Sequence, residues 1–428
     1  MHRPMVHQDA HTSSAQRNSY REVGACRICA SHALEDIIDL GNQALGSVFP
    51  QIGQPDPGKA PLVLMRCDEC GLVQLRHSVA PERLFTQGYG YRSGINATMQ
   101  RHLQGLASWV ERHCELRAGD LVLDIGCNDG TLLSAYAAKG LRRVGIDPIA
   151  AKFRYRYPAD FHVHEGFFSA ASYAIACGAE KARAITSIAM FYDLEAPAEF
   201  VAVIKSVLAD DGIWVLEQSY LPTMLEMNAY DTICHEHLEY YALRQIELLA
   251  RMHGLRIFHV ELNACNGGSF RLALCHERAA YSHDQQQLDA LRRHERDMRL
   301  DRAEPFGIFR QRVEDHRSAL RTFVDTQAKA GKRIYLYGAS TKGNVLLQYC
   351  GLDATKIIAA AERNPEKYGC RTPGSGIPII SEEEARAAKP DYFLVLPWHF
   401  RDEFVARETE FRKAGGKLVF PLPQLDVV

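Results

Sequence analysis

The sequence has no long apolar run, no strong excess of one charge and no secretory signal. A membrane-spanning helix needs about 18 or more apolar residues in succession, and no such run occurs. The 428-residue chain carries a formal net charge of −2, which excludes the basic footprint of a nucleic-acid-binding protein at the level of the whole chain. Residues 1–20 are polar and rich in histidine, so we expect a disordered leader there and no signal peptide. From these absences we expect no membrane and no nucleic acid as a partner.

Cysteine is plentiful, with twelve residues, but most of them do not indicate disulfides. The majority lie scattered in apolar segments, where a free thiol behaves as a small hydrophobic side chain; examples are Cys177, Cys265, Cys275 and Cys350. Because disulfides are rare in reducing compartments, this pattern favours a cytoplasmic enzyme with reduced thiols.

Two cysteine pairs near the N-terminus have the spacing of metal ligands. Cys26 and Cys29 form one C-x-x-C pair, and Cys67 and Cys70 form the second. Each pair presents two thiolates to one metal ion, so two pairs complete a tetrahedral zinc site. Redox chemistry at a single pair is the alternative, but two pairs in a short segment favour structural zinc. A closed site with four thiolates has no open position for catalysis.

The segment Val122–Gly130 has the pattern of a cofactor-binding loop. It is an apolar run that leads into Asp-x-Gly-x-x-x-Gly, starting at Asp124, and its glycines let the backbone approach a ligand closely. A second apolar run ends in Asp147, which is placed to accept hydrogen bonds from ribose hydroxyls. The third glycine of the dinucleotide fingerprint is missing, and the loop instead resembles the first motif of class I S-adenosylmethionine (SAM) methyltransferases. An ordinary turn in another Rossmann-like protein is the alternative.

The apolar runs predict two α/β domains joined by a charged helical segment. The strands of the first domain are expected at residues 121–125, 143–146, 184–188, 213–217, 256–260 and 269–274. Residues 280–330 predict one or two amphipathic helices. From Arg333 the strand, glycine turn and helix pattern restarts, which predicts a second, smaller α/β domain. Its turn offers backbone N–H groups and the charge of Lys342 to a phosphate, and a loop that only packs is an equal alternative.

Proton-transfer groups are concentrated between residues 230 and 241. His235, Glu236 and His237 are consecutive, and Tyr230 precedes them. A metal site is one interpretation, but His-x-His lacks the i, i+4 spacing of a helical zinc-protease pair. A polar turn that packs its histidines on the surface is another. We favour a general base, in which an imidazole takes a proton and a carboxylate fixes its tautomer.

Together these motifs resemble those of the SAM-dependent C-methyltransferases that act on nucleotide-linked 4-keto deoxysugars. The resemblance runs from Cys26 to the C-terminus and includes the four cysteines and the cofactor loop. Its further motifs are the Tyr-x-Tyr-x-Ser segment at residues 89–93, Asp231–His237, Asn266–Ser269, Gly338–Asn344, Glu362–Lys367 and Leu396–Phe400.

The resemblance implies a class I methyltransferase Rossmann-like domain, with a small N-terminal zinc module and a second, C-terminal Rossmann-like α/β domain. We therefore expect a leader (1–20), a zinc-binding module (21–82), a methyltransferase domain (83–265), and a helical linker with the C-terminal domain (266–428). The implied cofactors are SAM and structural zinc. The implied partner is a nucleotide-linked sugar or related small molecule, and we expect a monomer or a weak homodimer.

The implied chemistry starts with removal of a proton from C3 of the sugar, which the neighbouring 4-ketone acidifies. By resemblance His237 is the base, Glu236 is its partner and Tyr91 faces the keto sugar. His235 and Tyr230 complete the implied catalytic group. SAM is expected on the β-strand ends and the glycine loop, with Phe167 or Phe168 near the adenine; the full expected set is Asp124, Gly126, Asn128, Asp129, Asp147 and Phe168.

Two positions depart from the family pattern. Cys234 stands where the best-known sugar enzymes have tyrosine, and because a thiol is a weak donor, a contact to the enolate is lost or moves to Tyr230 or Tyr240. Asp193 lies in the stretch where those enzymes have a histidine. These changes keep open a second hypothesis, O-methylation of a sugar or another small metabolite. A third is a non-catalytic SAM-binding assembly factor, against which the intact loop and the His-Glu-His segment argue.

Overall fold

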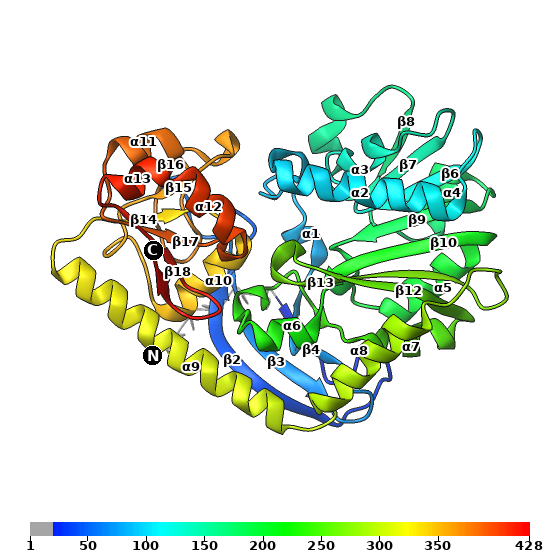
Figure 1. The fold of residues 1–428 in the computed structure, drawn as a ribbon, viewed down its shortest axis with the longest axis horizontal. Coiled ribbons are helices and arrows are strands. Elements are labelled where there is room, and N and C mark those ends of the chain that lie inside the picture. Colours follow the sequence, from blue (N-terminus) through cyan, green and yellow to red (C-terminus); the bar gives the residue numbers. More distant parts are fainter. Residues whose placement is uncertain (1–19) are drawn as a thin grey trace, which may run out of the picture.

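A seven-stranded sheet forms the centre of one lobe of the molecule, on the right in Figure 1, and carries the cofactor loop. The computed structural model describes residues 20–428. Five parallel strands run in the order β8-β7-β6-β9-β10, then β13 is antiparallel to β10 and β12 is antiparallel to β13. The strands are β6 (Leu121–Ile125), β7 (Arg142–Asp147), β8 (Phe161–Glu165), β9 (Ala182–Ile188), β10 (Leu208–Ser219), β12 (Leu255–Asn263) and β13 (Ser269–His276). The strand order reverses between β6 and β9, and ligands of open α/β sheets bind at such a reversal.

Helices cover both faces of this sheet because its central strands are apolar on both sides; all five residues of β6 are buried. Helices α2 and α3 lie on one face, while α5, α7 and α8 pack together on the other (Figure 1). The helices are α2 (Ala97–Cys114), α3 (Thr131–Ala135), α4 (Ala170–Cys177), α5 (Pro197–Val207), α6 (Leu221–Glu226), α7 (Leu243–Met252) and α8 (Gln285–Asp297). In α2 the buried positions recur every three or four residues, as an amphipathic helix requires; they include Met99, Leu103, Leu106 and Val110.

The N-terminal module is a four-stranded sheet in the order β11-β4-β3-β2, beside a two-stranded pair of β1 and β5. Its strands are β1 (Tyr20–Glu22), β2 (Leu34–Ala44), β3 (Lys59–Cys67), β4 (Val73–Leu75), β5 (His77–Val79) and β11 (Glu239–Tyr240). The short edge strand β11 comes from the segment that follows the His-Glu-His motif. The module and the methyltransferase domain are therefore joined by backbone hydrogen bonds.

The C-terminal domain holds a six-stranded sheet in the order β16-β15-β14-β17-β18-β19, parallel except for β19. Its strands are β14 (Ile334–Tyr337), β15 (Ala360–Glu362), β16 (Ile379–Ser381), β17 (Tyr392–Val395), β18 (Lys417–Phe420) and β19 (Asp426–Val427). Its helices are α10 (Thr341–Cys350), α11 (Glu382–Ala387), α12 (Arg401–Arg407) and α13 (Thr409–Lys413). The long helix α9 (Glu304–Lys329) precedes it and packs on α10, β14 and β2 (Figure 1).

The sheets confirm the predicted fold class of two Rossmann-like domains with a small N-terminal module. Strand β13 lies beyond the boundary expected at residues 265–266, yet it belongs to the seven-stranded sheet because it pairs with both β10 and β12. The expected leader falls outside the described residues, apart from Tyr20, which begins β1. Within residues 20–428, none of the helices combines the length and the apolar character that crossing a bilayer needs.

Candidate active site

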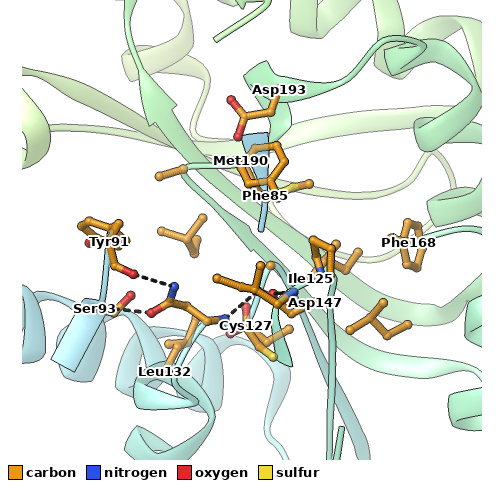
Figure 2. Close-up of a pocket in the computed structure, with 18 of the residues that line it drawn as sticks. Phe85, Tyr91, Ser93, Ile125, Cys127, Leu132, Asp147, Phe168, Met190 and Asp193 are labelled. Carbon is orange, nitrogen blue, oxygen red and sulfur yellow. Dashed lines mark hydrogen bonds between the residues drawn. The ribbon is translucent and has the colours of Figure 1, made fainter. Parts of the chain in front are cut away.

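The glycine loop after β6 lines a cavity of about 290 Å³ at the carboxyl edge of the seven-stranded sheet (Figure 2). Gly126 has a φ of +73°, and a Cβ there would lie 3.3 Å from Cγ of Met190 on the opposite wall. Asp147 at the end of β7 is buried, and its carboxylate accepts hydrogen bonds from the N–H groups of Asn128 (2.8 Å) and Ile149 (2.7 Å). The loop and the second strand are therefore locked together around the cavity, which we call the cofactor cavity.

The remaining walls of the cofactor cavity are mostly apolar. Phe168 lines it and packs on Phe200, with ring centroids 5.0 Å apart. Asp124 also lines it; burial raises the pKa of this carboxyl to about 7, while a hydrogen bond from Thr186 opposes the rise. A glycine turn without room for a Cβ, an acid at the end of the second strand and an apolar wall suit an adenosine cofactor.

Asp129 was expected to bind the cofactor, but the structure turns its side chain away from the cofactor cavity. Its carboxylate is fully buried and accepts hydrogen bonds from Nε of Arg92 and the N–H of Gly94, both at 3.1 Å. Its other oxygen accepts from the Thr131 hydroxyl at 2.5 Å. Asp129 therefore holds a neighbouring segment of the chain, and its backbone forms part of the glycine turn.

A second cavity of about 330 Å³ lies between the methyltransferase domain and the C-terminal domain. It continues from the cofactor cavity, because both are lined by the same residues at their junction: Tyr89, Tyr91, Met99, Ala189 and Asn266. One end holds the Cys234, Glu236 and His237 side chains, with the charge of Lys342 in α10 close to His237, and the other end is the Gly338–Ser340 turn before α10. We call it the acceptor cavity.

His237 lies at the first end of the acceptor cavity in a defined orientation. Its Nδ1 is 2.9 Å from the Thr232 carbonyl oxygen, which can only accept, so Nδ1 carries the proton and Nε2 is the unprotonated nitrogen. Burial and then the positive charge of Lys342 lower the pKa of His237 to about 3, against the opposing effect of the Thr232 hydrogen bond. The ring is therefore neutral and keeps a lone pair on Nε2.

Glu236 was expected to orient His237, and the structure contradicts that role. Both carboxylate oxygens of Glu236 are buried and have no hydrogen-bond partner among the described residues, while His237 is oriented by the Thr232 carbonyl. Glu236 lines the acceptor cavity. A buried carboxylate without a partner costs free energy unless a ligand supplies a donor, so its position indicates a contact with the acceptor.

The side chains of His235 and Tyr230 are directed away from both cavities. Nε2 of His235 lies 2.9 Å from the Ala60 carbonyl oxygen in β3, and the hydroxyl of Tyr230 lies 3.0 Å from Nδ1 of His316 in α9. These bonds join the motif to the N-terminal module and to the linker helix. The structure thus gives both residues a packing role in place of the predicted catalytic one.

The two positions that depart from the family pattern lie beside the cavities. Cys234 is buried in the acceptor cavity, and Asp193 lines the cofactor cavity (Figure 2). The pKa of Asp193 is raised well above its usual range by burial and then by the charges of Glu236 and Glu239. One oxygen of Asp193 is buried without a hydrogen-bond partner among the described residues. A buried carboxyl with a raised pKa and a buried thiol therefore occupy the two positions that depart from the expected pattern.

Glu217, near the carboxyl end of β10, lines neither the cofactor cavity nor the acceptor cavity. Its carboxylate is buried and lies 2.5 Å from Nε2 of His102 and 2.8 Å from Nε of Arg271. Two residues that the sequence did not single out as site residues come from the C-terminal domain: His399 and Lys367 line the acceptor cavity. Both lie within motifs of the family resemblance, which were the available signal.

The four N-terminal cysteines meet at one point, and their arrangement fits zinc. Their sulfur atoms all lie within 4.8 Å of one another, with 3.4 Å between those of Cys26 and Cys70 and 3.5 Å between those of Cys29 and Cys67. Four thiolates at about 2.3 Å from one ion span similar distances. In each knuckle the residue after the second cysteine has a positive φ and donates its N–H to the first cysteine's carbonyl; these residues are Ala30 and Gly71.

Comparisons with known proteins agree with this geometry. Three family models match successive parts of the chain: a zinc binding domain (26–85), a methyltransferase domain (98–260) and a C-methyltransferase C-terminal domain (264–423). C-methyltransferase NovU from Streptomyces niveus is 31% identical over 420 residues, which cover 95% of this chain and 97% of that protein.

Solved structures of methyltransferases resemble part of the chain at low identity. Magnesium protoporphyrin IX methyltransferase from Synechocystis PCC 6803, with bound S-adenosylhomocysteine (SAH), is 14% identical, with a TM-score of 0.32; the match covers 42% of this chain and 87% of that one. CalS10, an amino pentose methyltransferase from Micromonospora echinaspora, is 16% identical, with a TM-score of 0.31, and the match covers 41% and 90%.

The sheet order, the cofactor loop and the matching methyltransferase domain define a class I SAM-dependent methyltransferase. Since it is similar to NovU over nearly its whole length, the chain belongs to the family of SAM-dependent C-methyltransferases. SAM and structural zinc, the two predicted cofactors, are confirmed as those of the family. The chain is an enzyme, and the hypothesis of a non-catalytic assembly factor is excluded.

Proposed function

We propose that the enzyme methylates C3 of a nucleotide-linked 4-keto deoxysugar through an enolate of the sugar. SAM, when bound, supplies an electrophilic methyl group on its sulfonium. The protein must then provide a base for the C3 proton, positive charge or donors for the enolate oxygen, and a site for the nucleotide. The acceptor cavity offers groups suited to each of these tasks.

The observation that carries the proposal is the orientation of His237. Because Nδ1 is bonded to the Thr232 carbonyl, the unprotonated Nε2 is left to take a proton from the acceptor. The charge of Lys342, which lowers the pKa of His237, would stabilise the negative charge that develops on the sugar oxygen. Lys342 is fixed in place, since its ammonium donates to the Asn266 carbonyl at 3.0 Å.

The far end of the acceptor cavity suits an anionic group such as the diphosphate of a nucleotide. The Gly338–Ser340 turn leads into the N-terminus of α10, where the helix dipole favours negative charge; the Gly343 N–H is bonded to the Ser340 hydroxyl and the Ala339 N–H to Glu362. Lys367 adds an ammonium that lines the cavity, and burial lowers its pKa. An anion bound there would oppose that lowering and keep Lys367 charged. A sugar between the two ends would place its keto group beside His237.

Exchange of the C3 proton with solvent tests the proposed base without requiring methyl transfer. The protein is loaded with unreactive SAH in D₂O and mixed with nucleotide-linked 4-keto-6-deoxysugars, and loss of the C3 proton signal is followed by NMR. We expect exchange with the unmodified enzyme and none with His237→Asn. A matched control is His235→Gln, because His235 lies outside the cavity, and it should keep the exchange. Equal exchange with and without the imidazole of His237 would refute its role as the base.

A further inference from the structure

The segment Tyr89–Ile95, which we call the acceptor segment, supplies side chains to the acceptor cavity but has little structure of its own. The side chains of Tyr89, Tyr91 and Arg92 line that cavity. Tyr91 is 46% exposed. Only its last three residues form a single 3₁₀ turn, Ser93–Ile95. The position of its tyrosines therefore depends on contacts with other elements.

Two consecutive side chains of the cofactor loop hold this segment. Asn128 accepts a hydrogen bond from the Ser93 N–H at 3.0 Å and donates one to the Tyr91 carbonyl at 3.3 Å (Figure 2). Asp129 accepts one from the Gly94 N–H and one from the Arg92 guanidinium. Four hydrogen bonds thus run from the loop to the segment, and two of them fix backbone N–H groups.

The same loop lines the cofactor cavity. Asn128 lines that cavity, and its own N–H is bonded to the Asp147 carboxylate that is placed for the ribose. Its backbone has a φ of +48°, a left-handed conformation that needs support. A cofactor that contacts the loop and Asp147 therefore restricts the backbone from which the Asn128 and Asp129 side chains project.

The fit between loop and segment is tight on the side of Gly94. A Cβ on Gly94 would lie 2.6 Å from Oδ2 of Asp129 and 2.9 Å from Oγ1 of Thr131, so there is no room for even a methyl group. The other end of the segment is held by Lys152, whose ammonium donates to the Tyr89 carbonyl at 2.8 Å and pairs with Glu366 of the C-terminal domain at 3.2 Å. The loop and the segment are therefore in close contact at Gly94 and cannot approach each other further there.

We propose that Asn128 and Asp129 are positioning residues that couple the two cavities: through them, an occupied cofactor cavity orders the acceptor segment and strengthens acceptor binding. The coupling is reciprocal, because two ligands that favour one conformation raise each other's affinity by the same factor. Couplings of this kind are about 5- to 150-fold. The part that concerns the acceptor rests on the proposed function, whereas the ordering of the segment does not.

Hydrogen–deuterium exchange of the acceptor segment tests the ordering without any acceptor. In the unmodified enzyme, saturating SAH should slow exchange in a peptide covering residues 89–96 by about fivefold or more. Two variants, Gly94→Ala and Asp129→Ala, should remove this protection and still bind SAH within about threefold of the unmodified enzyme. Gly94→Ala pushes the segment away from the loop by steric clash and deletes no polar group. The matched control is Thr131→Val, which removes a partner of Asp129 that makes no hydrogen bond to the segment, and it should keep the protection.

Three results would overturn the coupling. The first is that SAH gives no protection in the unmodified enzyme, and the second is that Gly94→Ala and Asp129→Ala retain it. The third is that Asp129→Ala loses SAH affinity while its segment stays protected, which would make Asp129 a cofactor ligand. With a sugar that the enzyme methylates, Gly94→Ala should raise the KM for that sugar about fivefold or more with little change in SAH affinity. If the enzyme methylates none of the sugars, the proposed function fails, but the hydrogen–deuterium exchange with SAH still tests the coupling.

Discussion

The buried ion cluster of His102, Glu217 and Arg271 yields a stability prediction with a defined pH dependence. His102 projects from α2 and its Nε2 lies 2.5 Å from Glu217, which ends β10, while Arg271 of β13 pairs with the same carboxylate at 2.8 Å. The His102 side chain is 19% exposed and that of Glu217 is 2% exposed. The cluster ties the helix to two strands of the sheet beside the cofactor cavity. The perturbation is His102→Gln, which keeps a polar side chain but removes the positive charge.

The magnitude follows from the pKa of His102. Hydrogen bonds with Cys265 and then with Glu217 raise it from 6.5 to about 10, against the opposing effect of burial. At 1.36 kcal/mol per unit this corresponds to about 5 kcal/mol. Because the side chain is partly exposed, water and salt screen some of the interaction, and we expect about 2–3 kcal/mol in the free energy of unfolding.

The sign of the pH dependence follows from proton linkage. The folded state holds the His102 proton more tightly than the unfolded state, so the stabilisation is fully present below pH 6.5 and disappears as the pH rises through about 10. The unmodified enzyme should therefore be more stable than His102→Gln by about 2–3 kcal/mol at pH 6. At pH 10.5 we expect the two proteins to differ little.

Urea unfolding of both proteins at pH 6 and pH 10.5, with zinc present throughout, measures this difference. The matched control is His113→Gln on the same helix, because the His113 ring is bonded to the Trp109 carbonyl and has no carboxylate partner. That variant should show no such pH dependence relative to the unmodified enzyme. A deficit in His102→Gln that is as large at pH 10.5 as at pH 6 would refute the ion-pair reasoning and leave only lost packing.

Three further predictions concern the metal, the base and the anion end. Replacing Cys67 and Cys70 by serine should release zinc and lower the thermal stability of the enzyme, since bound metal contributes to folding; full stability without bound metal, measured by metal analysis and calorimetry, would contradict a structural role. His237→Asn should reduce turnover at least about a hundredfold, as for loss of a general base, with SAM affinity by calorimetry nearly unchanged; loss of SAM binding would instead indicate a role in the fold. Lys367→Met should raise the KM for a nucleotide-linked sugar about tenfold, as for loss of a charge-assisted hydrogen bond, while an unchanged KM would argue against an anion at the Gly338–Ser340 turn, to whose Ala339 carbonyl the Lys367 ammonium is bonded.

The sequence was sufficient for features whose cause is local. The cysteine knuckles, the strand and glycine turn at Val122–Gly130 and the restart of the pattern at Arg333 each depend on a few neighbouring residues. The structure has all of them, and the sheet order confirms the fold class. The resemblance to the family further placed His237 and Tyr91, and both line the acceptor cavity.

The sequence failed where a side chain finds its partner far along the chain. His235 bonds to Ala60, 175 positions away, and Tyr230 bonds to His316, 86 positions away. Nothing near either residue reveals those partners, so both were grouped with His237 in the catalytic set that the resemblance implies. The partners of Glu217 are equally distant in the sequence, since they lie in α2 and β13.

The loop residues show a different limit. Asn128 and Asp129 stand at positions where a cofactor contact is the natural expectation, and Asn128 does line the cofactor cavity. The direction of the Asp129 side chain follows from the path of the acceptor segment, which approaches so closely that Gly94 is required. Helix α2 packs both on α3, which follows the loop, and on the 3₁₀ turn of the acceptor segment, an arrangement that no single motif encodes.

The most direct test of the central claim is to locate the transferred methyl group. The purified enzyme is mixed with SAM carrying a ¹³C-labelled methyl group and with a panel of nucleotide-linked 4-keto-6-deoxysugars, and the product is examined by NMR. The account predicts label on C3 of the sugar ring and no product with His237→Asn. Label on a sugar oxygen would keep the fold and the cofactor but contradict the enolate chemistry.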